Sequence, residues 1–86
     1  AALIEAGKEM GFDAETATLL SIQTILGSAM LLEKDARSPE ELRDAVCSPG
    51  GTTLAALEVF KANDFRKTVK DALAAAEKRS KELSML

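Results

Sequence analysis

One segment has the residue types and spacing of a binding site: CSPGGTT, residues 47–53. Gly50 and Gly51 allow the backbone to adopt positive φ angles and to approach a ligand closely. Thr52 or Thr53 then opens the next helix. Backbone N–H groups at a helix start, with the helix dipole behind them, suit a carboxylate or a phosphate. A simple loop that ends in an N-cap explains the same residues, and on the pattern alone this plainer interpretation is favoured.

Few other side chains could act as catalytic or metal-binding groups. The sequence has no histidine and one cysteine, which excludes a histidine-based triad, a histidine metal site, a zinc finger and an internal disulfide. Cys47 has no histidine to activate it, and a nearby Asp44 would disfavour its thiolate, so we interpret it as a small buried side chain. The acidic residues Glu40 and Glu41 are explained by helix capping, and no metal site is predicted.

Composition limits the class of protein. The 86 residues are 47% apolar, 29% charged and 3% aromatic, which is typical of one small soluble domain with an aliphatic core. Residues 1–60 hold four basic and ten acidic side chains, a balance of −6, whereas residues 61–86 hold seven basic and four acidic, a balance of +3. The basic residues alternate with acidic ones, so nucleic-acid binding is not expected. The single cysteine and the lack of a signal peptide favour a cytoplasmic location.

The elements that must position the CSPGGTT segment are all helical. No stretch shows strand-like alternation, so we expect an all-α domain of four or five helices over residues 1–86. Gly11 is a candidate C-cap, Asp13 and Asp64 are candidate N-caps, and Ser38 with Glu41 forms a capping box. These signals place the helices at about 1–10, 13–34, 38–46, 52–62 and from 64 to the end. The first helix begins without a cap or an initiator methionine, so we expect a fragment of a longer protein.

The second predicted helix is unusual because no charged side chain occurs between Thr16 and Leu32. Its apolar residues point around most of the circumference, which indicates burial on most sides. The uncharged stretch is shorter than about 20 residues and contains threonines, serines and a glutamine, which argues against a membrane span. A domain of this size cannot enclose such a helix, so the sequence predicts an obligate dimer.

The last predicted helix is amphipathic. Apolar residues recur at spacings of three and four from Phe65 through Leu73 to Leu83. The other face has three oppositely charged pairs at i,i+4 spacing: Lys67 with Asp71, Glu77 with Lys81, and Lys78 with Glu82.

The run PEELRDAVCSPGGTTLAAL, residues 39–57, resembles the hallmark segment of pyrroline-5-carboxylate reductases. GKEMG at 7–11, QTILGSA at 23–29, Phe65-Arg66 and RSKEL at 79–83 are similar to other parts of the same family. The resemblance covers nearly the whole chain but only the C-terminal part of the family's architecture.

This resemblance implies an enzyme that reduces 1-pyrroline-5-carboxylate to L-proline with NADPH or NADH. The family's N-terminal Rossmann domain holds the nucleotide and is absent from this chain, so no cofactor-binding residue is expected here. The C-terminal helical domain interlocks with a second copy, in an arrangement like the C-terminal domain of 6-phosphogluconate dehydrogenase, and several members form higher assemblies.

The resemblance also implies roles for single residues. The loop from Ser48 to Thr53 would hold the substrate carboxylate through backbone N–H groups around Gly50, Gly51 and Thr52. Thr53 would offer its hydroxyl to the substrate nitrogen and is the one catalytic candidate. By itself the chain would be inactive. One alternative is a stand-alone helical homodimeric interaction module; another is an oxidoreductase of the same plan acting on a different imino acid.

Overall fold

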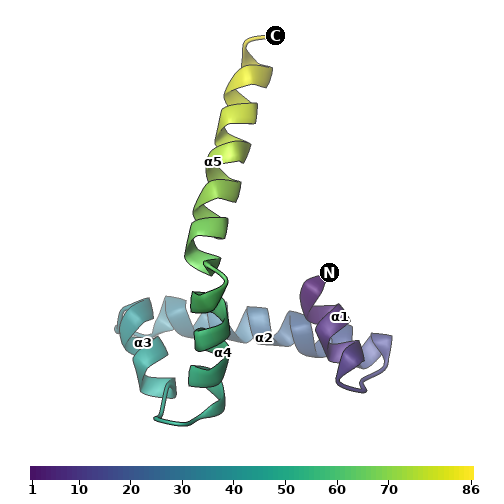
Figure 1. Ribbon diagram of the computed structural model, residues 1–86, viewed down its shortest axis with the longest axis vertical. Helices are drawn as coiled ribbons and strands as arrows, with labels where there is room; N and C mark the ends of the chain where they lie inside the picture. Colours follow the sequence, from purple (N-terminus) through teal and green to yellow (C-terminus); the bar gives the residue numbers. More distant parts are fainter. The chain divides into compact units, whose positions relative to one another are not determined.

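The computed structural model describes residues 1–86 and contains five helices and no strand (Figure 1). They are α1 (Ala2–Glu9), α2 (Ala14–Lys34), α3 (Pro39–Val46), α4 (Thr52–Ala62) and α5 (Phe65–Ser84). The all-α prediction and its five helices are therefore confirmed. The chain forms two compact units, Ala1–Arg43 and Asp44–Leu86.

In the first unit, α1 and α2 pack against each other around a glycine. Gly11, with φ of 105°, ends α1 and reverses the chain. The Asp13 side chain then caps α2 by accepting a 2.7 Å hydrogen bond from the Thr16 N–H. A Cβ atom at Gly7 would lie 3.0 Å from the Cβ of Ala17, and Ala17 is only 1% exposed. The two helices thus approach as closely as they do because position 7 has no side chain.

A branched side chain at position 7 should therefore separate the two helices. We expect Gly7→Val to lower the free energy of unfolding by about 1–3 kcal/mol, the usual effect of overpacking a tight contact. Chemical denaturation of the 86-residue chain measures this. Ala6→Val is the matched control, because Ala6 lies on the same helix and is exposed. Equal losses in the two variants would show that the Gly7 contact does not limit packing.

Helix α2 is apolar but almost unburied within one chain. Ala17 is its one buried residue. Its large side chains remain 43–60% exposed, namely Leu19, Leu20, Ile22, Ile25, Leu26, Met30, Leu31 and Leu32. The sequence predicted a helix too apolar to be enclosed by its own chain, and the structure confirms that the chain leaves it open.

By length and composition alone, α2 is also able to cross a membrane, a criterion that core helices of soluble proteins and signal sequences meet as well. Six per cent of its most apolar stretch is buried within the chain. The absence of a membrane partner, expected from the short uncharged stretch, stays a prediction.

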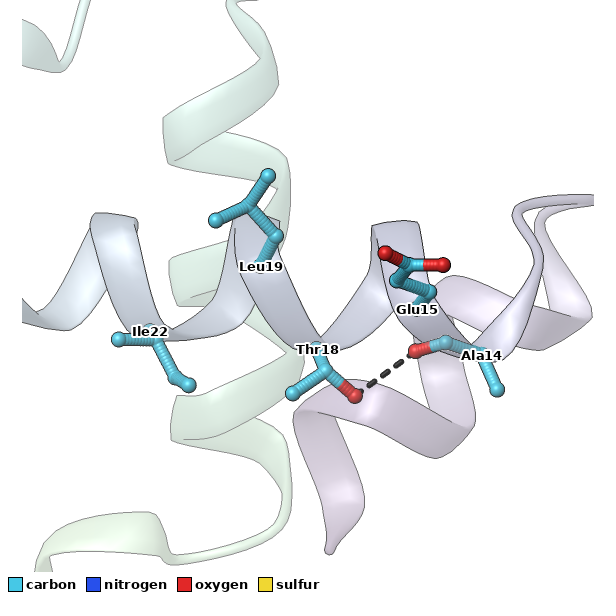
Figure 2. Close-up of a pocket in the computed structure, with 5 residues that line it drawn as sticks. All are labelled: Ala14, Glu15, Thr18, Leu19 and Ile22. Carbon is cyan, nitrogen blue, oxygen red and sulfur yellow. Dashed lines mark hydrogen bonds between the residues drawn. The ribbon is translucent and has the colours of Figure 1, made fainter.

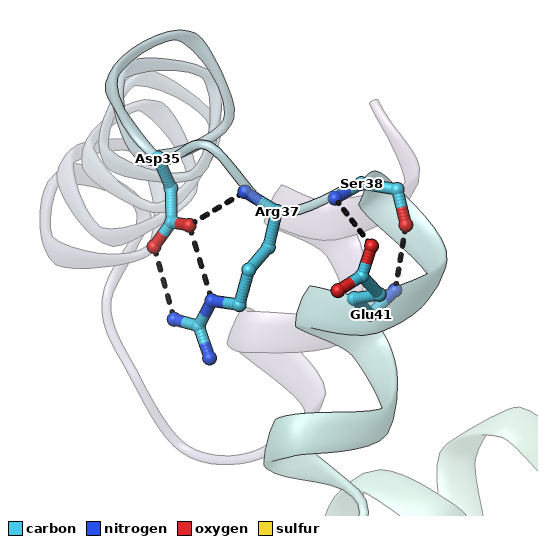
Figure 3. Close-up of polar contacts among 4 residues, drawn as sticks. All are labelled: Asp35, Arg37, Ser38 and Glu41. Carbon is cyan, nitrogen blue, oxygen red and sulfur yellow. Dashed lines mark hydrogen bonds and ion pairs between the residues drawn. The ribbon is translucent and has the colours of Figure 1, made fainter.

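The connection from α2 to α3 is held by local polar contacts (Figure 3). The Ser38 hydroxyl accepts the Glu41 N–H at 3.1 Å, and the Glu41 carboxylate accepts the Ser38 N–H at 3.3 Å, which confirms the capping box. Just before it, the Asp35 carboxylate accepts hydrogen bonds from the Arg37 guanidinium, at 3.1 and 2.9 Å, and from the Arg37 backbone N–H at 2.9 Å. The hydrogen bonds from the Arg37 side chain, and to a smaller extent the one from its backbone N–H, lower the pKa of Asp35 to about 2.

This lowered pKa has a predictable effect on stability. A carboxyl whose pKa is lower in the folded state stabilises the fold above its unfolded pKa of 3.8, and this contribution is lost as the pH falls through about 2. We therefore expect Asp35→Asn to lower the melting temperature at pH 6 and to have no effect near pH 1.5. Thermal unfolding at both pH values measures it. Arg37→Gln is the control that keeps the backbone N–H, and it should retain part of the pH dependence. A pH-independent effect of Asp35→Asn would contradict the assignment.

In the second unit, α4 passes into α5 through a two-residue corner. The Asn63 side chain donates to the Val59 carbonyl at 2.9 Å, and the rings of Phe60 and Phe65 lie 4.7 Å apart across the corner. Asp64 is the N-cap residue of α5, as predicted. Its side chain makes no capping hydrogen bond, however, because its φ of 52° and ψ of 45° are left-handed, whereas a capping side chain reaches the first-turn N–H groups from an extended conformation.

Ion pairs lie along the polar face of α5. Lys67 pairs with Asp71 at 2.6 Å and Lys81 with Glu77 at 3.0 Å, as predicted. The third prediction, Lys78 with Glu82, is wrong: the Glu82 carboxylate binds Arg79 at 3.0 Å. On a helix, the residues three and four positions before Glu82 both lie next to it, and here the residue three positions before it, Arg79, binds the carboxylate.

Candidate functional site

The CSPGGTT segment forms the loop that leads into α4. The Gly51 N–H donates to the Ser48 carbonyl at 2.9 Å, which closes a four-residue turn. Pro49 occupies the second position of this turn, and Gly50, with φ of 71°, occupies the third. Proline followed by a residue with positive φ is the pattern of a type II turn. The loop thus has a defined conformation within its own backbone.

The two glycines serve different purposes. Gly50 has the positive φ that the sequence led us to expect at both positions, whereas Gly51 has an ordinary extended conformation with φ of −81°. The expectation of a positive φ at Gly51 is therefore wrong. What limits position 51 is space: a Cβ atom there would lie 2.7 Å from the Ser48 hydroxyl oxygen and 3.0 Å from the Ser48 carbonyl oxygen.

Helix α4 begins directly at the end of this turn. Gly51 is its N-cap residue, has no side chain to cap it, and accepts the Ala55 N–H through its carbonyl at 3.2 Å. The N–H groups of the first helical turn, from Thr52, Thr53 and Leu54, precede that first intrahelical bond. These three N–H groups lie at the positive end of the helix dipole, a position that suits a carboxylate or a phosphate.

This geometry changes the set of expected backbone donors. The Gly51 N–H is used within the turn, so it is not the free donor that the sequence suggested. Leu54 was not among the sequence-derived candidates, although counting four N–H groups from the helix start would have included it. Thr53 is half-buried and Thr52 is exposed. The structure thus brings Ser48, Gly50, Gly51, Thr52 and Thr53 into one short element.

Cys47, at the start of the loop, is only partly covered within the chain, and it is a free thiol. Its interpretation as a small buried side chain is therefore wrong for the single chain. No group of three or more cysteine or acidic side chains lies together in a way that could hold a metal ion.

A shallow, open hollow on α2 offers no comparable chemistry (Figure 2). It is lined by Ala14, Glu15, Thr18, Leu19 and Ile22. The Thr18 hydroxyl donates to the Ala14 carbonyl of its own helix at 2.7 Å. The side chains of Leu19 and Ile22 form much of the remaining lining. Since its polar groups do not converge on one point, we assign it to the apolar surface of α2.

Comparison with known proteins identifies the family to which the chain belongs. The family described as pyrroline-5-carboxylate reductase dimerisation matches residues 1–83. The chain belongs to this family. It is 46% identical over 83 residues to a pyrroline-5-carboxylate reductase of Pseudomonas aeruginosa and 43% identical over 83 residues to one of Arabidopsis thaliana. Each match covers 96% of this chain and 30% of the relative, so the chain spans about a third of the length of these reductases.

Solved structures of the same family agree with the helical fold. A pyrroline carboxylate reductase of Plasmodium falciparum, in a crystal structure with NADP bound, superposes with a TM-score of 0.84 at 37% identity. The superposed region covers 87% of this chain and 29% of the Plasmodium falciparum protein. A 1-pyrroline-5-carboxylate reductase of Streptococcus pyogenes gives a TM-score of 0.79 at 39% identity, over 83% of this chain and 27% of that protein. The resemblance inferred from the sequence is confirmed.

Proposed function

We propose that these 86 residues are the dimerisation and substrate-loop domain of an enzyme that reduces 1-pyrroline-5-carboxylate to L-proline with NADPH or NADH. The observation that carries this proposal is the family match over residues 1–83, which includes the whole CSPGGTT loop. The reductases that match are about three times longer than this chain, so the activity belongs to a larger protein.

The nucleotide would be bound outside these residues. A dinucleotide is held in the Rossmann manner by a glycine-rich turn between a strand and a helix. This chain has no strand, and neither glycine of its loop follows one. The residues present therefore do not fit the cofactor, and the part they play concerns the substrate and the assembly.

Dimer formation would cover the apolar surface that a single chain leaves exposed. Eight large side chains of α2 and the apolar face of α5, with Phe65, Val69 and Leu73, are open to solvent in one copy. Exposed apolar surface of this extent is unfavourable in water, and burying the exposed half of each such side chain contributes about 0.8–1.5 kcal/mol. A second copy of the same chain would bury these faces, and higher assemblies are compatible with the family.

The loop would bind the carboxylate of the imino acid. The first-turn N–H groups of α4 point away from the helix body toward its positive end, where a carboxylate accepts their hydrogen bonds. Thr53 lies in the same turn. Reduction of a C=N bond adds a proton at nitrogen, so the Thr53 hydroxyl would donate a hydrogen bond to the imine nitrogen and accept one from the product amine. Carboxylate and nitrogen together orient the ring.

Two measurements test these proposals separately. Light scattering of the 86-residue chain over a dilution series tests assembly: a persistent dimer or larger species supports it, and a well-folded monomer refutes it. Oxidation of NADPH by the full-length protein in the presence of 1-pyrroline-5-carboxylate tests the activity. A six-membered cyclic imino acid as competing substrate distinguishes the reductase from an enzyme for a different imino acid. A folded dimeric full-length protein that reduces neither would favour the alternative of a stand-alone interaction module.

A further inference from the structure

We propose that Gly50 is a positioning residue, which aims the carboxylate donors of α4 through its left-handed backbone conformation and does not itself make room for the substrate. This inference rests on the proposed function, because it concerns how the substrate loop is held. It separates two roles that a glycine in a binding loop can have, close approach of a ligand and access to a conformation closed to other residues.

The turn and the helix share a residue. Gly51 donates its N–H to the Ser48 carbonyl and offers its own carbonyl to the Ala55 N–H. No spacer therefore separates the turn from the first turn of α4, and any rotation of the backbone at Gly50 is transmitted directly to the N–H groups of Thr52 and Thr53.

Space within the chain does not explain a glycine at position 50. A Cβ atom built there meets no other atom of the chain within 4 Å, whereas one at Gly51 meets Ser48 at 2.7 Å. The φ of 71° at Gly50 is the constraint, since a side chain makes this conformation unfavourable for most residues. Asparagine is the ordinary residue that tolerates it best.

This difference allows the two roles to be tested against each other. If conformation matters, the larger Gly50→Asn should perform better than the smaller Gly50→Ala. If close approach of the substrate matters, the order should reverse. The steady-state constants of the full-length reductase are measured for both variants with 1-pyrroline-5-carboxylate and with NADPH, together with the melting temperature.

We expect Gly50→Ala to raise the KM for 1-pyrroline-5-carboxylate about ten-fold, which reflects the usual unfavourable energy of a left-handed alanine, and to leave the KM for NADPH unchanged. Gly50→Asn should stay within about three-fold of the wild type. Any of three results would overturn the inference. The order of the two variants could be reversed, both variants could equal the wild type, or both KM values could rise equally together with a lower melting temperature. A wild-type protein without turnover would instead refute the proposed function, which keeps the two failures distinct.

Discussion

Leu26→Asp should dissociate the proposed dimer. Leu26 lies near the middle of α2 and is 50% exposed in a single chain. It belongs to the stretch from Thr16 to Leu32, which has no charged residue and which we expect to be buried in the dimer. In a twofold dimer each substitution occurs twice. Dimer formation buries the exposed half of each Leu26 side chain, so loss of the two leucines alone removes about 1.5–3 kcal/mol, and two unpaired carboxylates add a further desolvation penalty. We expect the dissociation constant to rise by more than about a hundred-fold, measured by sedimentation of the 86-residue chain over a dilution series.

Leu26→Met is the matched control, because it keeps the apolar character and nearly the volume of leucine, and it should remain dimeric. An unchanged mass for Leu26→Asp at all concentrations would show that α2 lies outside the interface. A monomer that keeps the helical content of the wild type would show that the chain folds before it associates.

Thr53→Ala in the full-length protein should lower kcat/KM for 1-pyrroline-5-carboxylate by about 10- to 100-fold, because it removes the hydroxyl that we propose to bond the substrate nitrogen and leaves that nitrogen without a partner. The dimer mass and the KM for NADPH should not change, since Thr53 lies in the first turn of α4 and the proposed nucleotide site lies outside these 86 residues. Steady-state kinetics with each substrate varied in turn, together with light scattering, measure these effects.

Thr53→Ser retains the hydroxyl and should keep most of the activity, which separates the hydrogen bond from the loss of a methyl group. Gly51→Val should be more damaging than Thr53→Ala, because its side chain would collide with Ser48 and distort the turn. If Thr53→Ala and Gly51→Val both keep wild-type kinetics, the loop is only a connector between two helices.

Local sequence signals predicted the helices well. Asp13, the Ser38 capping box, Gly11 and the Pro49-Gly50 pair mark ends that the structure reproduces to within a residue or two. These signals act through hydrogen bonds and φ preferences among residues a few positions apart, so they need no tertiary context. The candidate loop was found for the same reason, since its turn and helix start are local features.

The errors have a common cause. The side-chain hydrogen bond expected of Asp64, the partner expected for Glu82 and the positive φ expected at Gly51 all depend on which of two locally reasonable geometries is adopted. Residue type allowed either outcome in each case. The backbone path through the α4–α5 corner decided the first and the path through the Ser48 turn decided the third, whereas Glu82 had two oppositely charged neighbours on the same helix face.

By itself, the sequence determined that this protein is all-helical, where its helices begin and end, that α2 is too apolar to be enclosed by one chain, and that its loop is similar to that of pyrroline-5-carboxylate reductases. Only the three-dimensional structure showed which backbone groups remain available as donors, because a turn of this type can be open or closed by a hydrogen bond, and here the Gly51 N–H closes it. The close crossing of α1 and α2 at Gly7 was decided by the tertiary structure, since helix contacts depend on how faces far apart in sequence meet.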